Sequence, residues 1–339
     1  MSRDRNGPID HIFMCEGWHV FHDMFPFFEA LERKDKILFT DVCHEEKGTE
    51  NGLGIYPFSE IGNFPRSNER AIIYISFPRH FLQQVRNGPL SFYKHTKVVR
   101  VFHGIVGPWA NVLINQPDFL DVILAASKLD AGIWKQNSDY RVETVGWPKG
   151  ELFLEKFKPE CESDRKRLII ASNWAIEKAA FRICDYISQL SDYEITFTLH
   201  PHLLSRTQSW RRVNPDYVER KISKLKIPNV KVVECRHGIL PHMRNKDLML
   251  GVISSSSLEW LLFNRPIMFL REHPLLNFGP VIDFSESLEK QMNEAIQEDS
   301  RYHDRRLRLR EMLMSHFDGQ YANRFNELIN QLERELLTQ

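Results

Sequence analysis

The sequence lacks the local signals of several common protein classes. Its five cysteines, Cys15, Cys43, Cys161, Cys184 and Cys235, are scattered and form no C-x-x-C pair. This disfavours a zinc site and indicates a reducing compartment. No stretch reaches the about 18 consecutive apolar residues of a membrane span, and the N-terminus MSRDRNGPID is too polar for a secretory signal. We therefore expect a cytoplasmic protein.

An excess of charge of one sign is also missing. The chain has 45 Lys and Arg against 45 Asp and Glu, so it has no overall positive field, and we expect no nucleic-acid partner. It has no Asp-x-Asp pair, no G-x-x-x-x-G-K-[ST] loop, no full G-x-G-x-x-G, no G-x-S-x-G and no H-E-x-x-H. The missing carboxylate pair predicts a site that uses neither a metal nor a cofactor.

What the sequence does contain is an alternation of short apolar runs with segments of helical spacing. Strand-like runs occupy 11–15, 36–41, 71–76, 98–102, 122–126 and 143–145, and, after a polar connector at 148–166, 168–171, 194–199, 230–233, 248–253 and 267–270. Helical spacing occurs at 21–31, 81–86, 175–190, 286–297, 301–314 and 320–337. The alternation predicts an α/β protein with two doubly wound, Rossmann-like domains that face a central cleft. We expect an acceptor-side domain at 1–155 and a nucleotide-donor domain at 156–339 that includes the C-terminal helices.

Four consecutive serines are the most informative feature. Ser254, Ser255, Ser256 and Ser257 lie between a strand-like run and a helix in DLMLGVISSSSLEWLLFNRPIMFL, residues 247–270. The start of a helix offers unpaired N–H groups and the positive end of the helix dipole, and the serines add hydroxyl groups. One serine suffices for an ordinary helix cap, with the others filling a turn. The run of four favours a site for an anion such as phosphate.

Three histidines follow strand-like runs. His103 precedes Gly104 in VVRVFHGIVGPW, where an imidazole could act as general base toward a hydroxyl group or could simply cap the strand. His200 and His202 follow the run ITFTL and could donate hydrogen bonds to phosphate oxygens. A structural turn is the other interpretation of this His-Pro-His sequence.

Weaker candidates occur at other strand ends. Asn173, His237 and Gly238 could line a bound nucleotide, although an asparagine cap and a plain turn fit as well. Gly17 and Gly104 could allow close approach of an acceptor. The basic segment RYHDRRLRLRE at 301–311 predicts either a solvated helix face or a peripheral contact with the inner membrane surface.

Five segments in order resemble the CDP-glycerol glycerophosphotransferase family of teichoic-acid and capsule polymerases. They are FHG at 102–104, VGWPKGELF at 145–153, LHPH at 199–202, the serine segment at 247–270 and FDGQYANRF at 317–325. The resemblance implies a GT-B fold and metal-independent transfer from a cytidine-nucleotide donor to a hydroxyl group. The acceptor would be a polysaccharide, a polyol phosphate or a lipid-linked chain. It also implies that His103 is the base and that His200, Ser255 and Ser256 bind the donor diphosphate.

The chain departs from that family pattern just before the serines. Val252 and Ile253 stand where the family usually has an acidic and an aromatic residue. Three other interpretations therefore stay open. They are a transferase for CMP-linked sialic acid or Kdo or for another nucleotide sugar, a sugar-nucleotide epimerase, and a non-catalytic module that binds a nucleotide or a polysaccharide.

Overall fold

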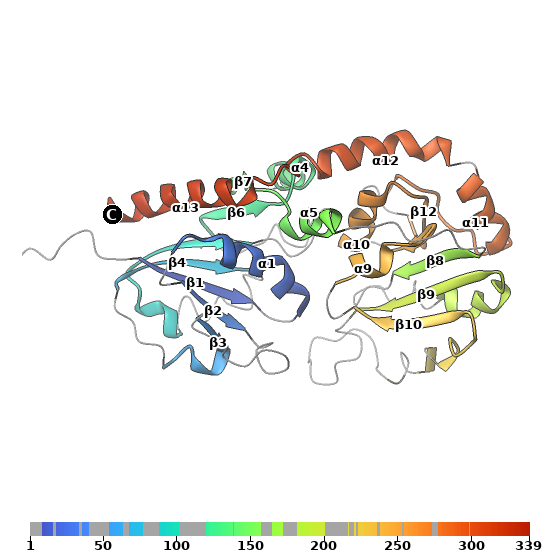
Figure 1. Ribbon diagram of the computed structural model, residues 1–339, viewed down its shortest axis with the longest axis horizontal. Helices are drawn as coiled ribbons and strands as arrows, with labels where there is room; N and C mark the ends of the chain where they lie inside the picture. Colours follow the sequence, from blue (N-terminus) through green and yellow to red (C-terminus); the bar gives the residue numbers. More distant parts are fainter. Residues whose placement is uncertain are drawn as a thin grey trace, which may run out of the picture. The chain divides into compact units, whose positions relative to one another are not determined.

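The chain forms two compact units. The computed structural model describes residues 9–15, 18–33, 36–40, 54–63, 68–76, 88–101, 120–137, 139–156, 165–171, 182–200, 216, 220–221, 223–235, 238–252, 254–272, 277–297 and 299–339. The first unit consists of Met1–Leu152 and Met314–Gln339, and the second of Phe153–Leu313. Each unit is built on its own parallel sheet (Figure 1).

The first unit contains a parallel sheet of seven strands. They are β1 (Asp10–Cys15), β2 (Lys36–Thr40), β3 (Ile55–Pro57), β4 (Arg70–Ile75), β5 (His95–Arg100), β6 (Val122–Ala125) and β7 (Val142–Thr144). Their order is β3-β2-β1-β4-β5-β6-β7, so the winding direction reverses between β1 and β4. Parallel strands must be joined by crossovers, and their two faces must be covered by helices.

Helices cover both faces of this first sheet. The helices α1 (Trp18–Ala30) and α13 (Tyr321–Leu337) pack against each other and against the sheet on one face. The ring of Phe325 lies 5.0 Å from that of Phe27 in α1 and 5.8 Å from that of Tyr74 in β4. On the other face, α4 (Lys128–Asn137) contributes the fully buried Trp134 to a second apolar cluster.

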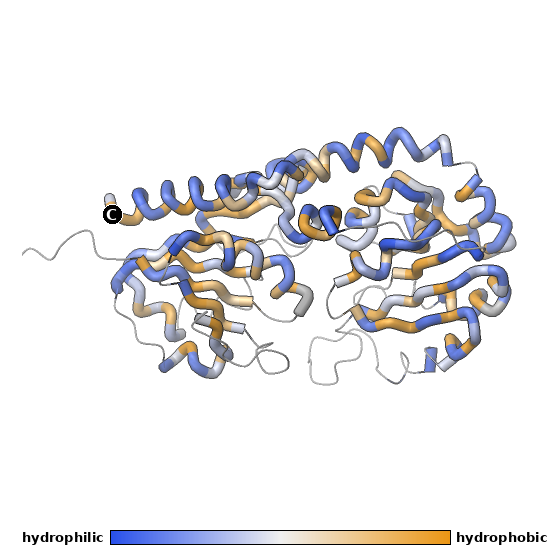
Figure 2. The backbone as a smooth tube through the Cα atoms, viewed as in Figure 1, coloured by the Kyte–Doolittle hydropathy of each residue, from blue (hydrophilic) through white to orange (hydrophobic). Residues whose placement is uncertain are grey.

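The second unit contains a parallel sheet of five strands. They are β8 (Lys166–Ala171), β9 (Tyr193–Leu199), β10 (Val230–Glu234), β11 (Leu248–Gly251) and β12 (Ile267–Phe269), in the order β10-β9-β8-β11-β12. Its helices are α9 (Leu240–Met243), α10 (Ser255–Glu259), α11 (Leu288–Gln297) and α12 (Ser300–Leu313). The strand β8 is hydrophobic and buried from Leu168 to Ala171, and β11 is buried throughout (Figure 2), as expected for a sheet covered on both faces. Two doubly wound sheets confirm the predicted α/β class.

The C-terminal segment corrects the predicted domain assignment. We expected 314–339 to belong with the second domain, but these residues pack with the first unit. The reason is the apolar stripe of α13, formed by Phe325, Leu328, Ile329, Leu332 and Leu336, which is buried. Polar contacts reinforce it, because Glu333 of α13 accepts two hydrogen bonds of 2.8 Å from Arg33. The chain therefore ends in the unit in which it began.

Local differences from the sequence prediction have physical causes. The segment predicted as a polar connector begins with a helix, α5 (Pro148–Glu155), because proline at the first helical position costs no hydrogen bond. The long helix expected at 175–190 is replaced at Ile183–Asp185 and Ile187–Gln189 by short 3₁₀ turns. The helix expected at 81–86 lies outside the described residues.

The basic helix α12 divides its five arginines between two sides. Arg306 is completely buried, and Arg310 donates a 3.0 Å hydrogen bond to the carbonyl of Leu262. The other three, Arg301, Arg305 and Arg308, are exposed. None of the helices in the described part of the chain is long and apolar enough to span a membrane.

Candidate functional site

The carboxyl edge of the second sheet brings several predicted residues to one end of the unit. Leu250 of β11 pairs with Ile170 of β8, which pairs with Phe197 of β9. His200 directly follows β9, and Ser254 follows β11 after two residues. Neighbouring strands are about 4.8 Å apart, so β9 and β11 lie about 10 Å apart on either side of β8. The winding direction reverses between β8 and β11, and ligands of doubly wound sheets bind outside such a switch point.

The four serines divide into different structural roles. Ser254 precedes the helix in an extended conformation, with φ −162° and ψ 162°, and its hydroxyl group contacts that of Ser256. Ser257 is completely buried, and its hydroxyl group donates a 2.7 Å hydrogen bond to the carbonyl of Val252. Ser255 and Ser256 are half-buried at the first turn of α10, where backbone N–H groups have no acceptor within the helix. Of the four serines, these two are therefore the ones placed to meet the predicted anion.

The last residue of β11 explains how tightly this turn is packed. A Cβ atom on Gly251 would lie 2.7 Å from Oγ of Ser257 and 3.2 Å from Cδ1 of Ile267. Glycine at this position thus lets the start of α10 sit directly against the strand end. The indole Nε1 of Trp260 adds hydrogen bonds of 2.9 and 3.0 Å to the carbonyls of Arg265 and Pro266. The serine turn is fixed on both sides.

Sequence reasoning missed a buried carboxylate close to the serines. Glu259 lies on α10 one turn after Ser255, and only 4% of its surface is exposed. Residues four apart lie on the same helix face. The only sequence signal was an acidic residue inside the apolar run LEWLLF. A carboxylate accepts hydrogen bonds from hydroxyl groups, so α10 offers N–H donors at its start and an acceptor one turn later.

Two further predicted residues lie at the same edge of this sheet. His200 is half-buried, and the preceding Thr198 donates a 3.1 Å hydrogen bond to the carbonyl of Ile170, which ties the end of β9 to β8. Gly238 follows β10 with φ 88°, a conformation that favours glycine, and its N–H donates to the carbonyl of Cys235. Three other predicted residues of this unit, Asn173, His202 and His237, lie outside the described residues.

The described part of the first unit contains a buried cation, three positions before the predicted base in the sequence. His103, Gly104 and Gly17 themselves lie outside the described residues. Arg100, the last residue of β5, is 2% exposed and lies over the ring of Trp134 at 4.6 Å. Burial lowers the pKa of its guanidinium group to about 10, and its Nε and Nη1 atoms have no hydrogen-bond partner among the described residues. Sequence reasoning missed this arginine because it lies inside the strand-like run VVRVF at 98–102, where a buried charge was not expected.

Two of the segments that carried the family resemblance meet in the first unit. In the first segment, Gly146 has φ 109°, and a Cβ atom there would lie 3.2 Å from Arg324. Arg324 donates a 3.0 Å hydrogen bond to the carbonyl of Val145 and pairs with Asp318 at 2.9 Å. Lys149 pairs with the buried Asp23 of α1 at 3.4 Å. These segments therefore join the returning C-terminal helix to the first sheet.

No cluster of three or more His, Cys, Asp and Glu side chains in the described residues could hold a metal ion.

No protein-family model and no curated protein matches the sequence. Solved structures, in contrast, match over nearly the whole chain. The chain is similar to S. aureus MnaA solved with UDP, with 13% identity, a TM-score of 0.62 and coverage of 97% of each chain.

Two further solved structures agree with this likeness. The chain is similar to a putative UDP-N-acetylglucosamine 2-epimerase from Listeria monocytogenes, with 13% identity, a TM-score of 0.60 and coverage of 97% of each chain. It is also similar to a variant of the wall teichoic acid polymerase TagF solved with CDPG, with 12% identity and a TM-score of 0.60. That match covers 99% of this chain and 91% of TagF. The predicted GT-B fold is therefore confirmed.

Proposed function

We propose that the protein is a GT-B transferase that takes a glycerophosphate or glycosyl group from a cytidine-nucleotide donor to a hydroxyl group of an acceptor. The observation that carries this proposal is the position of the serine turn and His200 at one edge of the second sheet, on either side of β8. A nucleotide diphosphate is an anion that suits this edge. The solved structures with UDP and with CDPG support a nucleotide ligand by analogy of fold.

In the proposed reaction His103 removes the proton of the acceptor hydroxyl group. The acceptor oxygen then forms a bond to the β-phosphorus of CDP-glycerol, or to the anomeric carbon of a CMP-sugar. The bond to the leaving nucleotide breaks, and the electron pair stays on CMP. His200, His202 and the N–H and hydroxyl groups of Ser255 and Ser256 stabilise the negative charge that grows on the leaving group. No metal takes part in this proposed reaction, so chelators should leave turnover unchanged.

The acceptor we propose is a polysaccharide, a polyol phosphate or a lipid-linked chain at the cytoplasmic face of the membrane. The exposed side of α12, with Arg301, Arg305 and Arg308, is the proposed contact with anionic lipid. Each basic residue near such a surface contributes about 1 kcal/mol, so this contact is weak and reversible.

A donor screen tests the proposed function. Purified protein is incubated with CDP-glycerol, CMP-sialic acid, CMP-Kdo and UDP-N-acetylglucosamine, and CDP and UDP binding is measured by calorimetry. We expect cytidine nucleotides to bind, and His200→Ala and the double variant Ser255→Ala/Ser256→Ala to weaken CDP binding about tenfold or more. The control is Ser191→Ala, an exposed serine of a distant turn in the same unit.

The same screen separates the other interpretations. Conversion of UDP-N-acetylglucosamine without an acceptor would instead identify an epimerase. Tight nucleotide binding without any acceptor-dependent release would identify a binding module. Loss of the base in His103→Ala should lower turnover at least 100-fold, the lower limit of general base catalysis. Turnover of this variant within a few-fold of the unchanged protein would remove His103 from the mechanism.

A further inference from the structure

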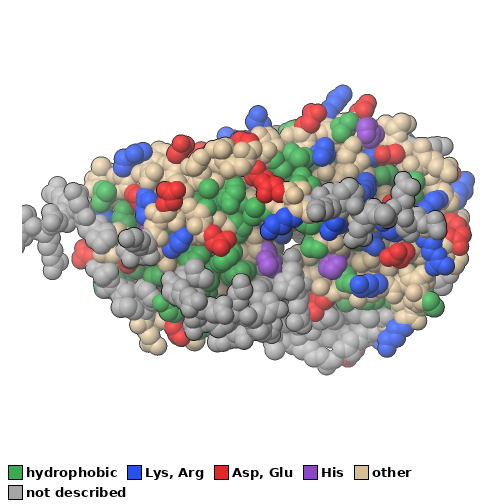
Figure 3. Space-filling model, viewed as in Figure 1, with side chains coloured by type: hydrophobic (Ala, Val, Ile, Leu, Met, Phe, Trp, Pro, Cys, Tyr) green, Lys and Arg blue, Asp and Glu red, His purple; other side chains and the backbone are tan. Residues whose placement is uncertain are grey.

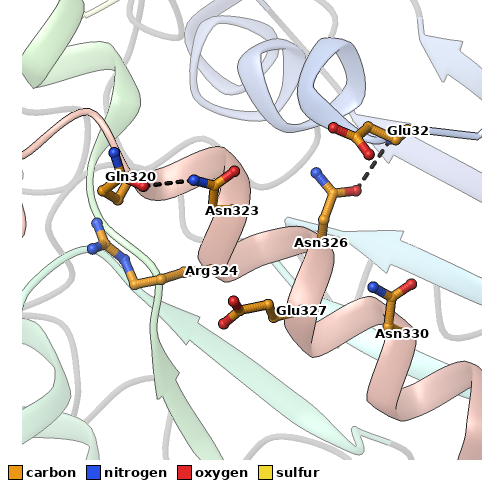
Figure 4. A pocket seen from close by; sticks show the side chains of 7 residues that line it. All are labelled: Glu32, Gln320, Asn323, Arg324, Asn326, Glu327 and Asn330. Atoms are coloured by element: carbon orange, nitrogen blue, oxygen red, sulfur yellow. Dashed lines mark hydrogen bonds between the residues drawn. The ribbon is translucent and has the colours of Figure 1, made fainter.

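A polar hollow lies on the first unit beside the C-terminal helix. It has a volume of about 330 Å³ and lies between α13 and the residue Glu32 that follows α1 (Figure 4). Its polar groups come from Gln320, which directly precedes α13, and from Asn323, Glu327 and Asn330 at successive turns of the helix. None of these side chains has a role in the proposed transfer.

Two asparagines of the hollow are held in fixed orientations. Asn326 donates a 2.8 Å hydrogen bond to the carbonyl of Ala30 and accepts one of 3.1 Å from the N–H of Glu32. The Oδ1 atom of Asn330 accepts a 2.5 Å hydrogen bond from Arg33. With one lone pair of its oxygen used by Arg33, Asn330 still offers both amide N–H groups to a ligand.

The other end of the hollow has a second fixed pair. Nδ2 of Asn323 donates a 2.5 Å hydrogen bond to Oε1 of Gln320 (Figure 4). This bond leaves the Nε2 donors of Gln320 and the Oδ1 acceptor of Asn323. Between the two ends lies the exposed carboxylate of Glu327, which has no hydrogen bond or ion pair in the described structure.

The combination of these groups identifies the chemistry of a ligand. Amide donors on both sides of a carboxylate acceptor match neighbouring hydroxyl groups, which both donate and accept. A phosphate-rich chain does not fit, because Glu32 and Glu327 are negative and the guanidinium group of Arg324 is occupied by Asp318 and the carbonyl of Val145. The hollow therefore favours a neutral chain.

The helix that carries the hollow is anchored, and Asn326 and Asn330 are held by hydrogen bonds. The opposite side of this helix buries Phe325, Leu328, Ile329, Leu332 and Leu336. Side chains that are already held in place lose little freedom when a ligand binds. We infer that this hollow binds a neutral, hydroxyl-rich saccharide segment of the acceptor. Only its identification as the acceptor rests on the proposed function; the binding itself does not.

Ligand-observed NMR titration of the full chain tests this inference. The probes are chitotetraose and maltotetraose, with inorganic polyphosphate as the anionic comparison. We expect at least one saccharide to bind with a Kd in the millimolar range, and the double variant Glu327→Gln/Asn330→Ala to weaken it at least fivefold. The control Glu60→Gln changes an exposed glutamate elsewhere in the same unit and should bind as the unchanged protein does.

Three outcomes would overturn the inference. They are no saccharide binding at about 10 mM, equal affinity in the double variant, and tighter binding of polyphosphate than of either saccharide. A thermal melt of the double variant checks that it is folded. The His200→Ala variant separates the two proposals, because it should lose CDP binding but keep saccharide binding. If the unchanged protein binds saccharide but no nucleotide, the proposed function fails and the saccharide site stands.

Discussion

The two units share one winding pattern but differ in how they use polar residues. Both sheets run outward from a central strand and reverse direction once, between β1 and β4 and between β8 and β11. The overall neutral charge hides a difference, because the first unit has 19 Lys and Arg against 23 Asp and Glu, whereas the second has 26 against 22. Lys and Arg side chains gather over the second unit on the face shown in Figure 3. The positive unit is thus the one whose sheet edge carries the serine turn.

In the first unit, described ion pairs hold the returning helix in place. Glu333 contacts His11 and Arg33, and Glu335 pairs with Arg141 at 3.1 Å and with Lys97 at 3.4 Å. These ion pairs join α13 to several elements of the first unit, so the charged residues here hold the helix in place. In the second unit the first turn of α10 instead keeps donors available. The comparison teaches that one fold can use polar groups to hold a helix in one unit and leave donors available at the sheet edge of the other.

Two completely buried arginines offer the sharpest test of this difference. Arg306 of the second unit pairs with Asp299 and donates to the carbonyl of Phe278, although its Nε has no partner among the described residues. Arg100 of the first unit has no described partner for either Nε or Nη1. Removing one member of a buried ion pair costs about 3 to 5 kcal/mol, so Arg306→Met should be strongly destabilised. Arg100→Met should lose less stability than Arg306→Met, because burial disfavours the charge of Arg100 and the attraction of Asp130 and the ring of Trp134 offset that penalty only in part. Urea unfolding of both variants measures their free energies of unfolding. Equal losses in the two variants would contradict this prediction.

The second prediction concerns the contact of Glu333 with the sheet of the first unit. Burial raises the pKa of this carboxyl group, but hydrogen bonds from His11 and Arg33 outweigh it and hold the pKa at about 2. A lowered carboxyl pKa adds stability that is present above the unfolded value of 4.5 and is lost as the pH falls through about 2. This difference between the unfolded and the folded pKa of Glu333 corresponds to about 3 kcal/mol of folding stability.

Glu333→Gln should therefore lower the free energy of unfolding by about 3 kcal/mol at pH 7. Its stability should also vary less than that of the unchanged protein between pH 4.5 and 2. Denaturant unfolding at several pH values measures both effects. Glu327→Gln, on the same helix but without a described partner, is the matched control and should change stability by less than about 0.5 kcal/mol.

The third prediction tests the packing of the serine turn. Gly251→Ala places a Cβ atom 2.7 Å from Oγ of Ser257, which should cost about 1 to 3 kcal/mol and weaken CDP binding. Ser257→Ala should cost about 1 kcal/mol, because the carbonyl of Val252 loses its hydrogen bond. The double variant should cost less than the sum, because the second change makes room for the first. Additive losses would show that the two residues do not share this space.

The sequence predicts where the strands lie better than it predicts which helices pack against each sheet. Short apolar runs indicate β1, β4, β8 and β11 directly, because a strand buried on both faces must be hydrophobic throughout. The three-residue strand β3 is half-buried and has no such run. The apolar stripe of α13 predicts a helix but not the sheet it covers. That sheet is determined by contacts such as Arg33 to Glu333, which are 300 positions apart.

The candidate site shows a similar limit. The strand, the serines and the helix that follows are visible in the sequence, because each has its own local pattern. Which serine turns inward is not visible, since four identical residues carry no such information. The structure distinguishes them through the glycine at the end of β11, against which Ser257 packs. Glu259 was missed because burial of a charged residue depends on tertiary contacts.

The smallest expected effect concerns the exposed side of α12. Arg301, Arg305 and Arg308 have no ion-pair partner among the described residues, so replacing all three by Gln should change stability by less than about 0.5 kcal/mol for each. Sedimentation with vesicles containing anionic lipid should nevertheless show weaker binding, and the difference should vanish at high salt because salt screens exposed charges. If the variant binds vesicles as well as the unchanged protein does, α12 does not contact the membrane. The proposed nucleotide site would then be the remaining role for the positive charge of the second unit.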